Sequence, residues 1–372
     1  MQFVDEFRDP QLAEALLTRI RQRVTDLPAD CRLPLQIMEV CGGHTHAIFK
    51  FGLDQLLPPE IEFVHGPGCP VCVLPMGRID QCVEIARRPG VVFCTFGDAM
   101  RVPGRNGSLL DAKRQGADVR IVYSPLDALT LAQQLPDREV VFFGLGFETT
   151  MPSTAVTLQQ ARRQGVNNFS VFCQHITITP TLRSLLQQPD VRIDGFIAPG
   201  HVSMVIGAHP YAFICDEFHK PLVITGFEPL DILQSLDMLL AQLCEGRCEV
   251  ENQYRRIVPD SGNTLAQQAL DEVFVTRERS EWRGLGEIEH SGVALSPAYA
   301  AFDAERRFQP QSQHVADDPQ ARCGDVLTGR CKPADCPLFG ARCNPQNAFG
   351  ALMVSSEGAC AAFYQYRRGM EQ

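Results

Sequence analysis

The stretch LQIMEVCGGHT (35–45) begins as an apolar run, turns at two glycines and leads into a segment with helical character. Its first half is typical of a strand buried on both faces, because buried parallel strands are apolar throughout rather than alternating. Further runs of this kind alternate with helix-like segments, at 61–66, 91–95, 119–124, 140–146, 169–174, 195–200 and 222–226. This alternation predicts an α/β fold with parallel strands that are covered by helices.

The predicted strands form two sets with similar spacing. Corresponding strands of the two sets lie 103 to 108 residues apart, and GGHT (42–45) aligns with GFET (146–149). Such regular self-similarity indicates a duplication, so we expect two similar small doubly wound domains at 33–135 and 136–244. Ligands bind beyond the carboxyl ends of parallel strands, and we therefore expect the two domains to face a cleft that holds the active site.

The remaining residues have a different pattern. NTLAQQALDEVF (263–274) predicts a helix with Asn263 as its N-cap, and EWRGLGEIEHSGVAL (281–295) suggests a hairpin. The N-terminal segment predicts an amphipathic helix. We assign 1–32 and 245–372 to a third, mixed α+β domain in which the N-terminal helix packs on the C-terminal part.

The composition argues against several classes of protein, namely nucleic-acid-binding, membrane and secreted proteins. A net charge of −10 argues against a nucleic-acid or anionic-membrane partner. No apolar run is long enough for a transmembrane helix, and the N-terminus does not resemble a signal peptide, so we expect a cytoplasmic protein. Among 15 cysteines in such a compartment, metal ligation or redox chemistry is favoured over a disulfide framework, although Cys94 and Cys173 lie in apolar runs typical of the core.

Cys41 lies at the end of the first predicted strand, directly before two glycines and a helix start. Backbone N–H groups in that setting lower the pKa of a thiol, so we expect a thiolate that binds metal or attacks an electrophile. His44 can orient this thiolate, donate a proton or act as a second ligand. One thiolate and one imidazole leave coordination positions open, whereas a buried cysteine in a tight turn would give the same pattern.

The second predicted strand ends in HGPGCPVC (65–72), which presents Cys69 and Cys72 with C-x-x-C spacing. In a thioredoxin-type dithiol the first sulfur attacks and the second resolves. The same spacing is also half of a zinc site, but the chain has no second C-x-x-C. We favour a redox pair, and Cys41 can hold a metal beside it.

The C-terminal tail is rich in cysteine, with Cys323, Cys331, Cys336, Cys343 and Cys360. Their irregular spacing lacks the paired knuckles of zinc ribbons, whereas a [4Fe–4S] cluster accepts thiolates from scattered loops. We predict that four of these five cysteines bind a [4Fe–4S] cluster. The spacing leaves open which one is spare.

The strand ends of the second set carry other titratable and polar residues. GFETT (146–150) provides Glu148 and Thr149, and PGHVS (199–203) provides His201. We include these three among the candidate catalytic residues, although Glu148 and the threonines can equally cap a helix. No Walker A loop or G-x-G-x-x-G motif follows a predicted strand, so nucleotide binding has no support in the sequence.

At CGGHTHAIFKFG, GPGCPVCVLP, GFETT, PGHVS and the cysteine tail, the sequence strongly resembles the HypD family of hydrogenase maturation factors. The resemblance runs nearly the full length and keeps these rare motifs in the same order. It implies a complex with a HypC-type chaperone, on which the Fe(CN)2CO group of [NiFe]-hydrogenase is assembled for the large subunit. A HypE-type protein would donate cyanide.

The resemblance also implies roles for individual cysteines. Cys41 would be a ligand of the transient iron that carries CN and CO, shared with a cysteine of the chaperone. Cys69 and Cys72 would exchange electrons with the tail cluster. Such a protein would transfer ligands and electrons without turning over a free metabolite, and whether it counts as an enzyme stays open.

Two alternatives remain at this point. An iron–sulfur thiol–disulfide oxidoreductase that acts on protein disulfides would use the same cluster and the same C-x-x-C pair, but not Cys41 as an iron ligand. A zinc-stabilised interaction protein would contain zinc and no brown chromophore.

Overall fold

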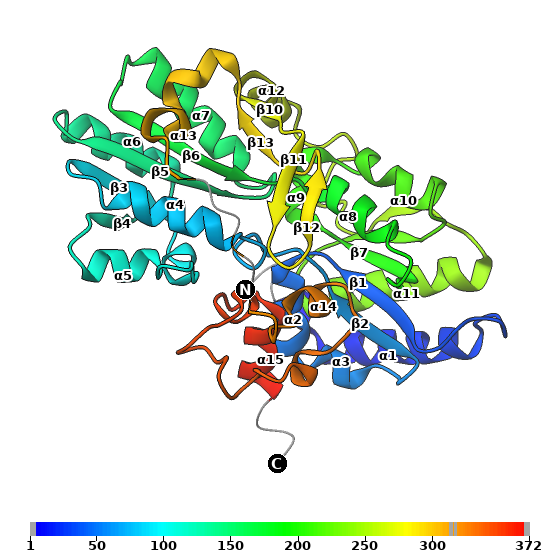
Figure 1. Cartoon of the computed structure of the whole chain (residues 1–372). Coiled ribbons are helices and arrows are strands. Elements are labelled where there is room, and N and C mark those ends of the chain that lie inside the picture. Colours follow the sequence, from blue (N-terminus) through cyan, green and yellow to red (C-terminus); the bar gives the residue numbers. More distant parts are fainter. Residues whose placement is uncertain (1–4, 312–314, 316–317, 368–372) are drawn as a thin grey trace.

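Two parallel sheets dominate the computed structural model, which describes residues 5–311, 315 and 318–367 (Figure 1). The first sheet has the order β2–β1–β7–β8–β9, and the second has the order β4–β3–β5–β6. The strands of the first sheet are β1 (Leu35–Glu39), β2 (Ile61–His65), β7 (Gly195–Pro199), β8 (Leu222–Thr225) and β9 (Val250–Asn252). Those of the second are β3 (Val91–Thr95), β4 (Val119–Ile121), β5 (Glu139–Gly146) and β6 (Phe169–His175). The predicted α/β class with parallel sheets is confirmed.

The distribution of strands between the sheets differs from the prediction. The sequence pattern groups β1 and β2 with β3 and β4, but β1 pairs with β7 and β3 pairs with β5. The predicted domains 33–135 and 136–244 therefore each contribute two strands to each sheet, and the prediction of two sheets that are contiguous in sequence is wrong. Apolar runs specify that strands are buried, but they do not specify which strands pair.

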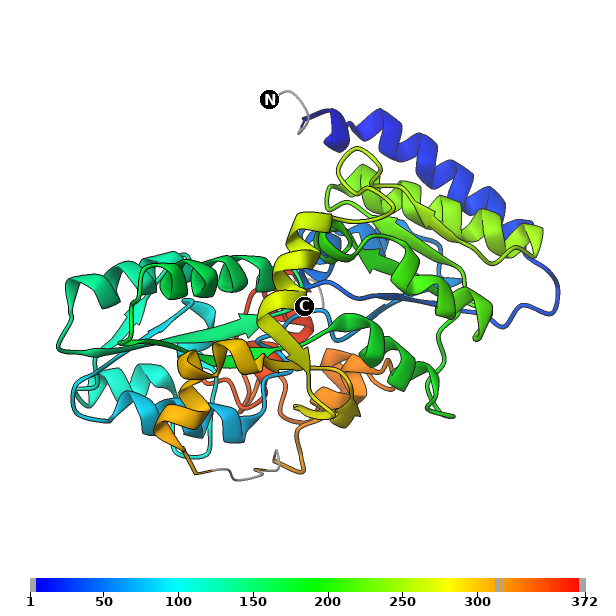
Figure 2. The same cartoon turned by 90° about the horizontal axis from the view of Figure 1, so that it is seen from above.

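The N-terminal helix also lies elsewhere than expected. Helix α1 (Pro10–Thr25) packs along α11 (Pro229–Glu245), which covers the first sheet (Figure 2). Leu17 and Ile20 of α1 belong to the core beneath that sheet. The predicted packing on the C-terminal part is therefore wrong, and residues 1–4 and 368–372 of the predicted third domain lie outside the described part of the chain.

Alternating strand residues enter different cores, as a sheet with two covered faces requires. In β1, Leu35 and Ile37 pack beneath α11, whereas Met38 enters the large core that reaches the second sheet and the tail. Cys94 and Cys173 are buried in the core beneath α6 and α7, which confirms them as core residues. The helices between the strands are α2 (Gly42–Lys50), α3 (Leu53–Leu56), α4 (Met76–Ala86), α5 (Leu109–Arg114), α6 (Pro125–Gln134), α7 (Met151–Arg163), α8 (Ile178–Leu186), α9 (Gly200–Ile206) and α10 (Ala212–Asp216).

The C-terminal third packs across both sheets. The Asn263 side chain accepts a hydrogen bond from Ala266 N at 3.0 Å and caps α12, so the predicted helix and its N-cap are confirmed. The elements of this part are α12 (Thr264–Val273), β10 (Phe274–Thr276), β11 (Arg279–Trp282), β12 (Gly286–Glu289), β13 (Val293–Leu295), α13 (Ala304–Phe308), α14 (Cys323–Leu327) and α15 (Ala359–Arg367). Strands β11 and β12 form the expected hairpin.

The tail returns to the first sheet, where α15 packs on α2 and α14 on β2 (Figure 1). This return brings the C-terminal cysteines to the carboxyl ends of β1 and β2. Over the described residues, we find no helix with both the length and the apolar character needed to cross a bilayer.

Candidate metal and redox site

The loop that carries Cys41 begins where β1 ends and leads directly into α2. Cys41 is the N-cap residue of α2 and is partly exposed. Gly68 packs so closely on this loop that a Cβ atom there would collide with backbone atoms of Val40 and Cys41. The structure therefore brings Cys41 next to the loop of Cys69 and Cys72.

The Cys41 thiol differs from the prediction. Burial raises the pKa of Cys41 to about 12, and the N–H groups of Gly43 and His44 only partly oppose this. The nearby carboxylates of Glu357 and Glu39 raise the pKa further. The helix N-terminus does act on the sulfur, but desolvation outweighs it, so the predicted low pKa is wrong and the metal-free residue is a neutral thiol at pH 7.

Glu39 is fully buried directly before this loop and holds it in place. One carboxylate oxygen accepts from Cys41 N at 3.0 Å, and the other accepts from His65 Nδ1 at 2.7 Å and from the Thr45 hydroxyl. Glu39 is a site residue that the motifs in the sequence do not single out. A charged residue inside the apolar run LQIMEV is the signal that points to it, because a buried carboxylate needs several partners.

Cys69 and Cys72 are joined in a disulfide, which is the oxidised form of the predicted redox pair. Both residues are buried. The tail reaches this pair, since a Cβ atom on Gly358 would lie 3.0 Å from Cys72 Sγ.

A buried arginine ties the segment after this disulfide to other parts of the chain. Arg283 N donates to Val73 O at 2.8 Å. The Arg283 guanidinium donates to Pro103 O at 3.1 Å and to Phe349 O at 3.3 Å. The backbone and side chain of this one residue therefore link the segment after the C-P-V-C loop, the connection that follows β3 and the tail.

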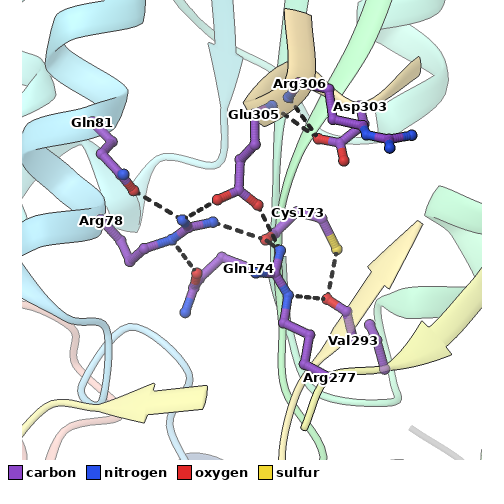
Figure 3. Close-up of polar contacts among 9 residues, drawn as sticks. All are labelled: Arg78, Gln81, Cys173, Gln174, Arg277, Val293, Asp303, Glu305 and Arg306. Atoms are coloured by element: carbon purple, nitrogen blue, oxygen red, sulfur yellow. Dashed lines mark hydrogen bonds and ion pairs between the residues drawn. The ribbon is translucent and has the colours of Figure 1, made fainter. Parts of the chain in front are cut away.

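The helix that follows the C-P-V-C loop is anchored by the ion cluster in Figure 3. Arg78 of α4 and Arg277, which directly follows β10, both bind the Glu305 carboxylate, and Arg78 Nε donates to Gln174 Oε1 at 2.6 Å. Burial opposes the charge of Glu305, but the two arginines outweigh it and lower the pKa of Glu305 to about 2. This cluster fixes α4, and with it the C-P-V-C loop, to the second sheet.

Four tail cysteines surround one small pocket. Cys323, Cys336, Cys343 and Cys360 line it together with apolar residues that include Val326, Leu338, Leu352 and Met353. Cys331 does not line it. Burial raises the pKa of Cys360 well above its usual value, and the neighbouring thiols add to this.

The donor set of this pocket fits an iron–sulfur cluster. Four thiols in an apolar surrounding are what a cubane cluster requires. A Cβ atom on Gly350 would collide with Cys323 Sγ. The thiol can occupy its position in the pocket because residue 350 has no side chain. In the described residues, no three Cys, His, Asp or Glu side chains converge closely enough for a single metal ion. The four thiols therefore surround a space, as a multi-atom cluster requires, and do not converge on the position of a single ion.

His44 and His201 lie on either side of one aromatic ring. The Phe227 ring stacks on His44 at 4.6 Å and on His201 at 3.9 Å between ring centres. His44 Nε2 donates to Gly226 O at 3.0 Å, and Nδ1 has no hydrogen-bond partner within the described part of the chain. Burial lowers the pKa of both imidazoles, so both are neutral at pH 7.

Glu148 is buried at the end of β5. Its Oε1 accepts from Ile178 N at 3.1 Å, whereas Oε2 lacks a partner among the described residues. Burial raises the pKa of Glu148 to about 7. Glu148 and Cys41 both act electrostatically on Tyr211, which places the two near the same side chain. Thr149 is exposed, and the N-cap of α7 is Thr150.

Glu357 is a second site residue that sequence reasoning missed. It packs on Gly42, and burial, followed by Asp98, raises its pKa. The segment Ser355–Cys360 thus contacts the Cys41 loop through Glu357, Cys72 through Gly358 and the four-thiol pocket through Cys360. The only sequence feature that points to Glu357 is its position three residues before Cys360. This feature is weak, because the contact of Glu357 with the Cys41 loop becomes evident only in the folded chain.

Comparison with known proteins gives consistent matches over the whole chain. The family model HypD, described as the hydrogenase formation hypA family, matches residues 11–367. The hydrogenase maturation factor HypD of Escherichia coli (strain K12) is 68% identical over 368 residues, 99% of each chain. That of Rhodobacter capsulatus is 58% identical over 370 residues, 98% of each chain. The hydrogenase expression/formation protein HupD of Azotobacter chroococcum mcd 1 is 50% identical over 374 residues, 99% of this chain and 97% of that protein.

Proposed function

Since this chain belongs to the HypD family and therefore has a role in hydrogenase maturation, we propose that it is the scaffold on which the Fe(CN)2CO group of [NiFe]-hydrogenase is assembled. It would work in complex with a HypC-type chaperone and receive cyanide from a HypE-type donor. One observation carries the proposal. The segment Ser355–Cys360 contacts the Cys41 loop, the Cys69–Cys72 disulfide and the four-thiol pocket together.

Cys41 is the proposed protein ligand of the iron substrate. A thiolate is a soft ligand that suits low-spin iron with CN and CO, and one thiolate leaves the other positions free for those groups. The Cys41 side chain is partly exposed, so a partner cysteine can complete the coordination. Glu39 holds the Cys41 backbone in position from below.

We propose that the buried Glu148 carboxyl group near Cys41, when protonated, donates to the polar end of a ligand. His44 Nδ1 is unprotonated when Nε2 donates to Gly226 O, so it is proposed to accept a hydrogen bond from an incoming donor. His44 Nδ1 and Glu148 Oε2 are buried and lack partners among the described residues, and leaving such atoms unsatisfied is costly. A diatomic ligand with an acceptor atom would satisfy a protonated carboxyl group. Thr149, which follows Glu148, and His201, which stacks on Phe227, are both exposed.

Cys69 and Cys72 are proposed to supply two electrons for cyanide release. In the balanced step, two thiols and R–S–C≡N give a Cys69–Cys72 disulfide, R–SH and HCN. The S–CN bond breaks, the S–S bond forms, and the two thiol protons go to the donor sulfur and to cyanide. The Cys69–Cys72 disulfide would be the product state of that proposed step.

Cys323, Cys336, Cys343 and Cys360 are the residues that would hold a [4Fe–4S] cluster. When bound, such a cluster supplies one-electron chemistry close to the disulfide. Gly358 lies two residues before Cys360 and against Cys72, which keeps the two redox sites close.

Anaerobic co-purification with a HypC-type partner tests the proposal. The wild-type complex is expected to contain iron with infrared bands of bound CN and CO, and Cys41→Ser is expected to lose them. Cys31→Ser is the matched control, because Cys31 is also partly exposed but lies before β1, at the opposite end of the strand. Retention of the bands in Cys41→Ser would contradict the proposal.

A thiol–disulfide oxidoreductase is the alternative that the Cys69–Cys72 disulfide favours. Cys41→Ser separates the two functions. If the variant reduces a protein disulfide at the wild-type rate and the wild type carries no CN-bearing iron, the oxidoreductase is correct. Zinc in place of iron in the purified protein would contradict both.

A further inference from the structure

A basic hollow lies on the surface beside the four-thiol pocket. One wall comes from Arg101, Ser108 and Arg114, and the other comes from Pro345, Gln346 and Asn347 of the tail. The second wall belongs to the chain segment between Cys343 and Gly350, both of which line the four-thiol pocket. The hollow and the pocket are therefore separated by a single loop.

The charge of this surface is opposite to that of the whole protein. The chain carries a net charge of −10, but residues 99–116 contain four basic residues and one acidic residue. Arg101, Arg105, Lys113 and Arg114 are all exposed. Arg342 is exposed on the tail side of the same loop, where its guanidinium stacks on Phe349.

Asp111 lines the hollow, and Asp80 and Asp98 lie in or beside the same part of the chain. Asp111 accepts from Ser108 N at 3.0 Å and from Arg114 Nη1 at 3.1 Å. Asp80 accepts from the backbone N–H groups of Arg105 and Asn106, and Asp98 accepts from the Ser355 hydroxyl at 2.9 Å. These three carboxylates offset part of the positive charge, but the basic residues of this surface outnumber them, so an excess of positive charge remains.

We propose that this hollow is the docking site for a small acidic one-electron carrier protein of the flavodoxin or ferredoxin type. The inference rests on the proposed function, in which the Cys69–Cys72 disulfide must be reduced again after each cyanide release. The balance requires two molecules of reduced carrier and two protons for each disulfide, and yields two oxidised carriers and two thiols.

Charge and position together favour this occupant. A local positive patch on a negative protein attracts and orients an acidic partner, and electrostatic steering of this kind speeds association at low ionic strength. Electron transfer also requires the partner to approach the redox group closely. The loop of Pro345–Asn347 is the thin wall that such a partner would contact.

Charge reversal on the purified full-length chain tests the site, with oxidised flavodoxin as the probe. For Arg101→Glu/Arg114→Glu we expect binding at least about 10-fold weaker at low salt, and a loss of the salt dependence. Arg114→Glu alone keeps the bond from Arg101 to Val354 O and is expected to lose part of the affinity, whereas Arg101→Lys/Arg114→Lys retains it. Arg163→Glu/Arg279→Glu, with the same change in net charge at exposed residues elsewhere, is the control and is expected to bind as the wild type.

A second measurement follows the thiols formed at Cys69 and Cys72 by alkylation and mass spectrometry. With photoreduced flavodoxin, the double reversal is expected to slow thiol formation about as much as it weakens binding, whereas dithionite reduces all variants alike. Equal flavodoxin binding by the double reversal and the wild type would overturn the docking site, as would an equal loss in the control. Tighter binding of an oligonucleotide than of flavodoxin would also overturn it. Absence of iron from wild-type protein would instead overturn the proposed cluster, since the binding titration does not depend on it.

Discussion

Glu357 packs directly on Gly42: a Cβ atom on Gly42 would lie 2.5 Å from Glu357 Cβ and 3.0 Å from Glu357 O. The first turn of α2 and the tail can approach this closely only because residue 42 has no side chain. The contact joins the loop of Cys41 to the segment that leads to Cys360.

Gly42→Ala is expected to push the tail away from α2, because the new methyl group meets backbone as well as side-chain atoms. We expect a loss of about 1–3 kcal/mol of unfolding free energy, measured as a lower midpoint in urea. Gly97→Ala is the control, since Gly97 has helical φ and only Ile121 lies within 4 Å of its Cβ position. That variant should change stability by less than about 1 kcal/mol, and an equal effect of both would contradict the proposed clash.

Glu305→Gln is expected to remove an acid-dependent contribution to stability. The pKa of Glu305 is lowered to about 2 in the folded chain, so its contribution is present above the unfolded value near 4.5 and is lost as pH falls toward 2. At pH 7 we expect the variant to be less stable by about 2–3 kcal/mol, and near pH 2 the difference should vanish. Urea titrations across this range measure it.

Glu217→Gln provides the contrast, because Glu217 pairs with Arg183 on the surface, where solvent screens the charges. Its effect on stability at pH 7 should be much smaller. If the two variants lose the same stability, the ion cluster of Figure 3 is not what anchors α4.

Glu148 is expected to produce the opposite pH dependence. Its pKa is raised to about 7 in the folded chain, so between pH 4.5 and 7 the folded state binds more protons than the unfolded state. Stability should therefore fall by about 3 kcal/mol as pH rises from 4.5 to 8. Glu148→Gln should lack this part of the pH profile. Parallel profiles for variant and wild type would mean that Glu148 does not titrate in this range.

Single Cys→Ser variants of the tail should divide into two groups. Those at Cys323, Cys336, Cys343 and Cys360 are expected to lose iron and the brown absorbance, since each removes one of the four proposed ligands. Cys331→Ser should keep close to the wild-type iron content, because Cys331 does not line the pocket. Iron analysis after anaerobic purification measures this, and loss of iron in Cys331→Ser would mean that the ligand set is different.

The local elements of the fold could be predicted from sequence. The run LQIMEV (35–40) became β1 (Leu35–Glu39), and Asn263 became the N-cap of α12. These predictions succeeded because burial and capping depend on nearby residues. Strand pairing depends on contacts between segments that are distant in sequence. The apolar pattern therefore could not predict that β1 pairs with β7 and that β3 pairs with β5.

The candidate site likewise has features that nearby residues determine and features that depend on distant contacts. Cysteine spacing was enough to single out Cys41, Cys69 and Cys72 as one group of loops. The high pKa of Cys41 was not predictable, because it depends on burial and on Glu357, more than 300 residues further along the chain. Similarly, the placement of Cys331 outside the pocket depends on how the tail winds between α14 and α15.

The order in which the strands join the first sheet has a consequence for biosynthesis. The second sheet is complete once the ribosome has added β6, but the first sheet then still lacks β7, β8 and β9. At that stage of synthesis, Cys41, Cys69 and Cys72 still belong to an unfinished sheet. Because the segment Ser355–Cys360 is translated almost last, a truncated product would have these cysteines but not the segment that contacts their loops, and under the proposed function it would not acquire iron.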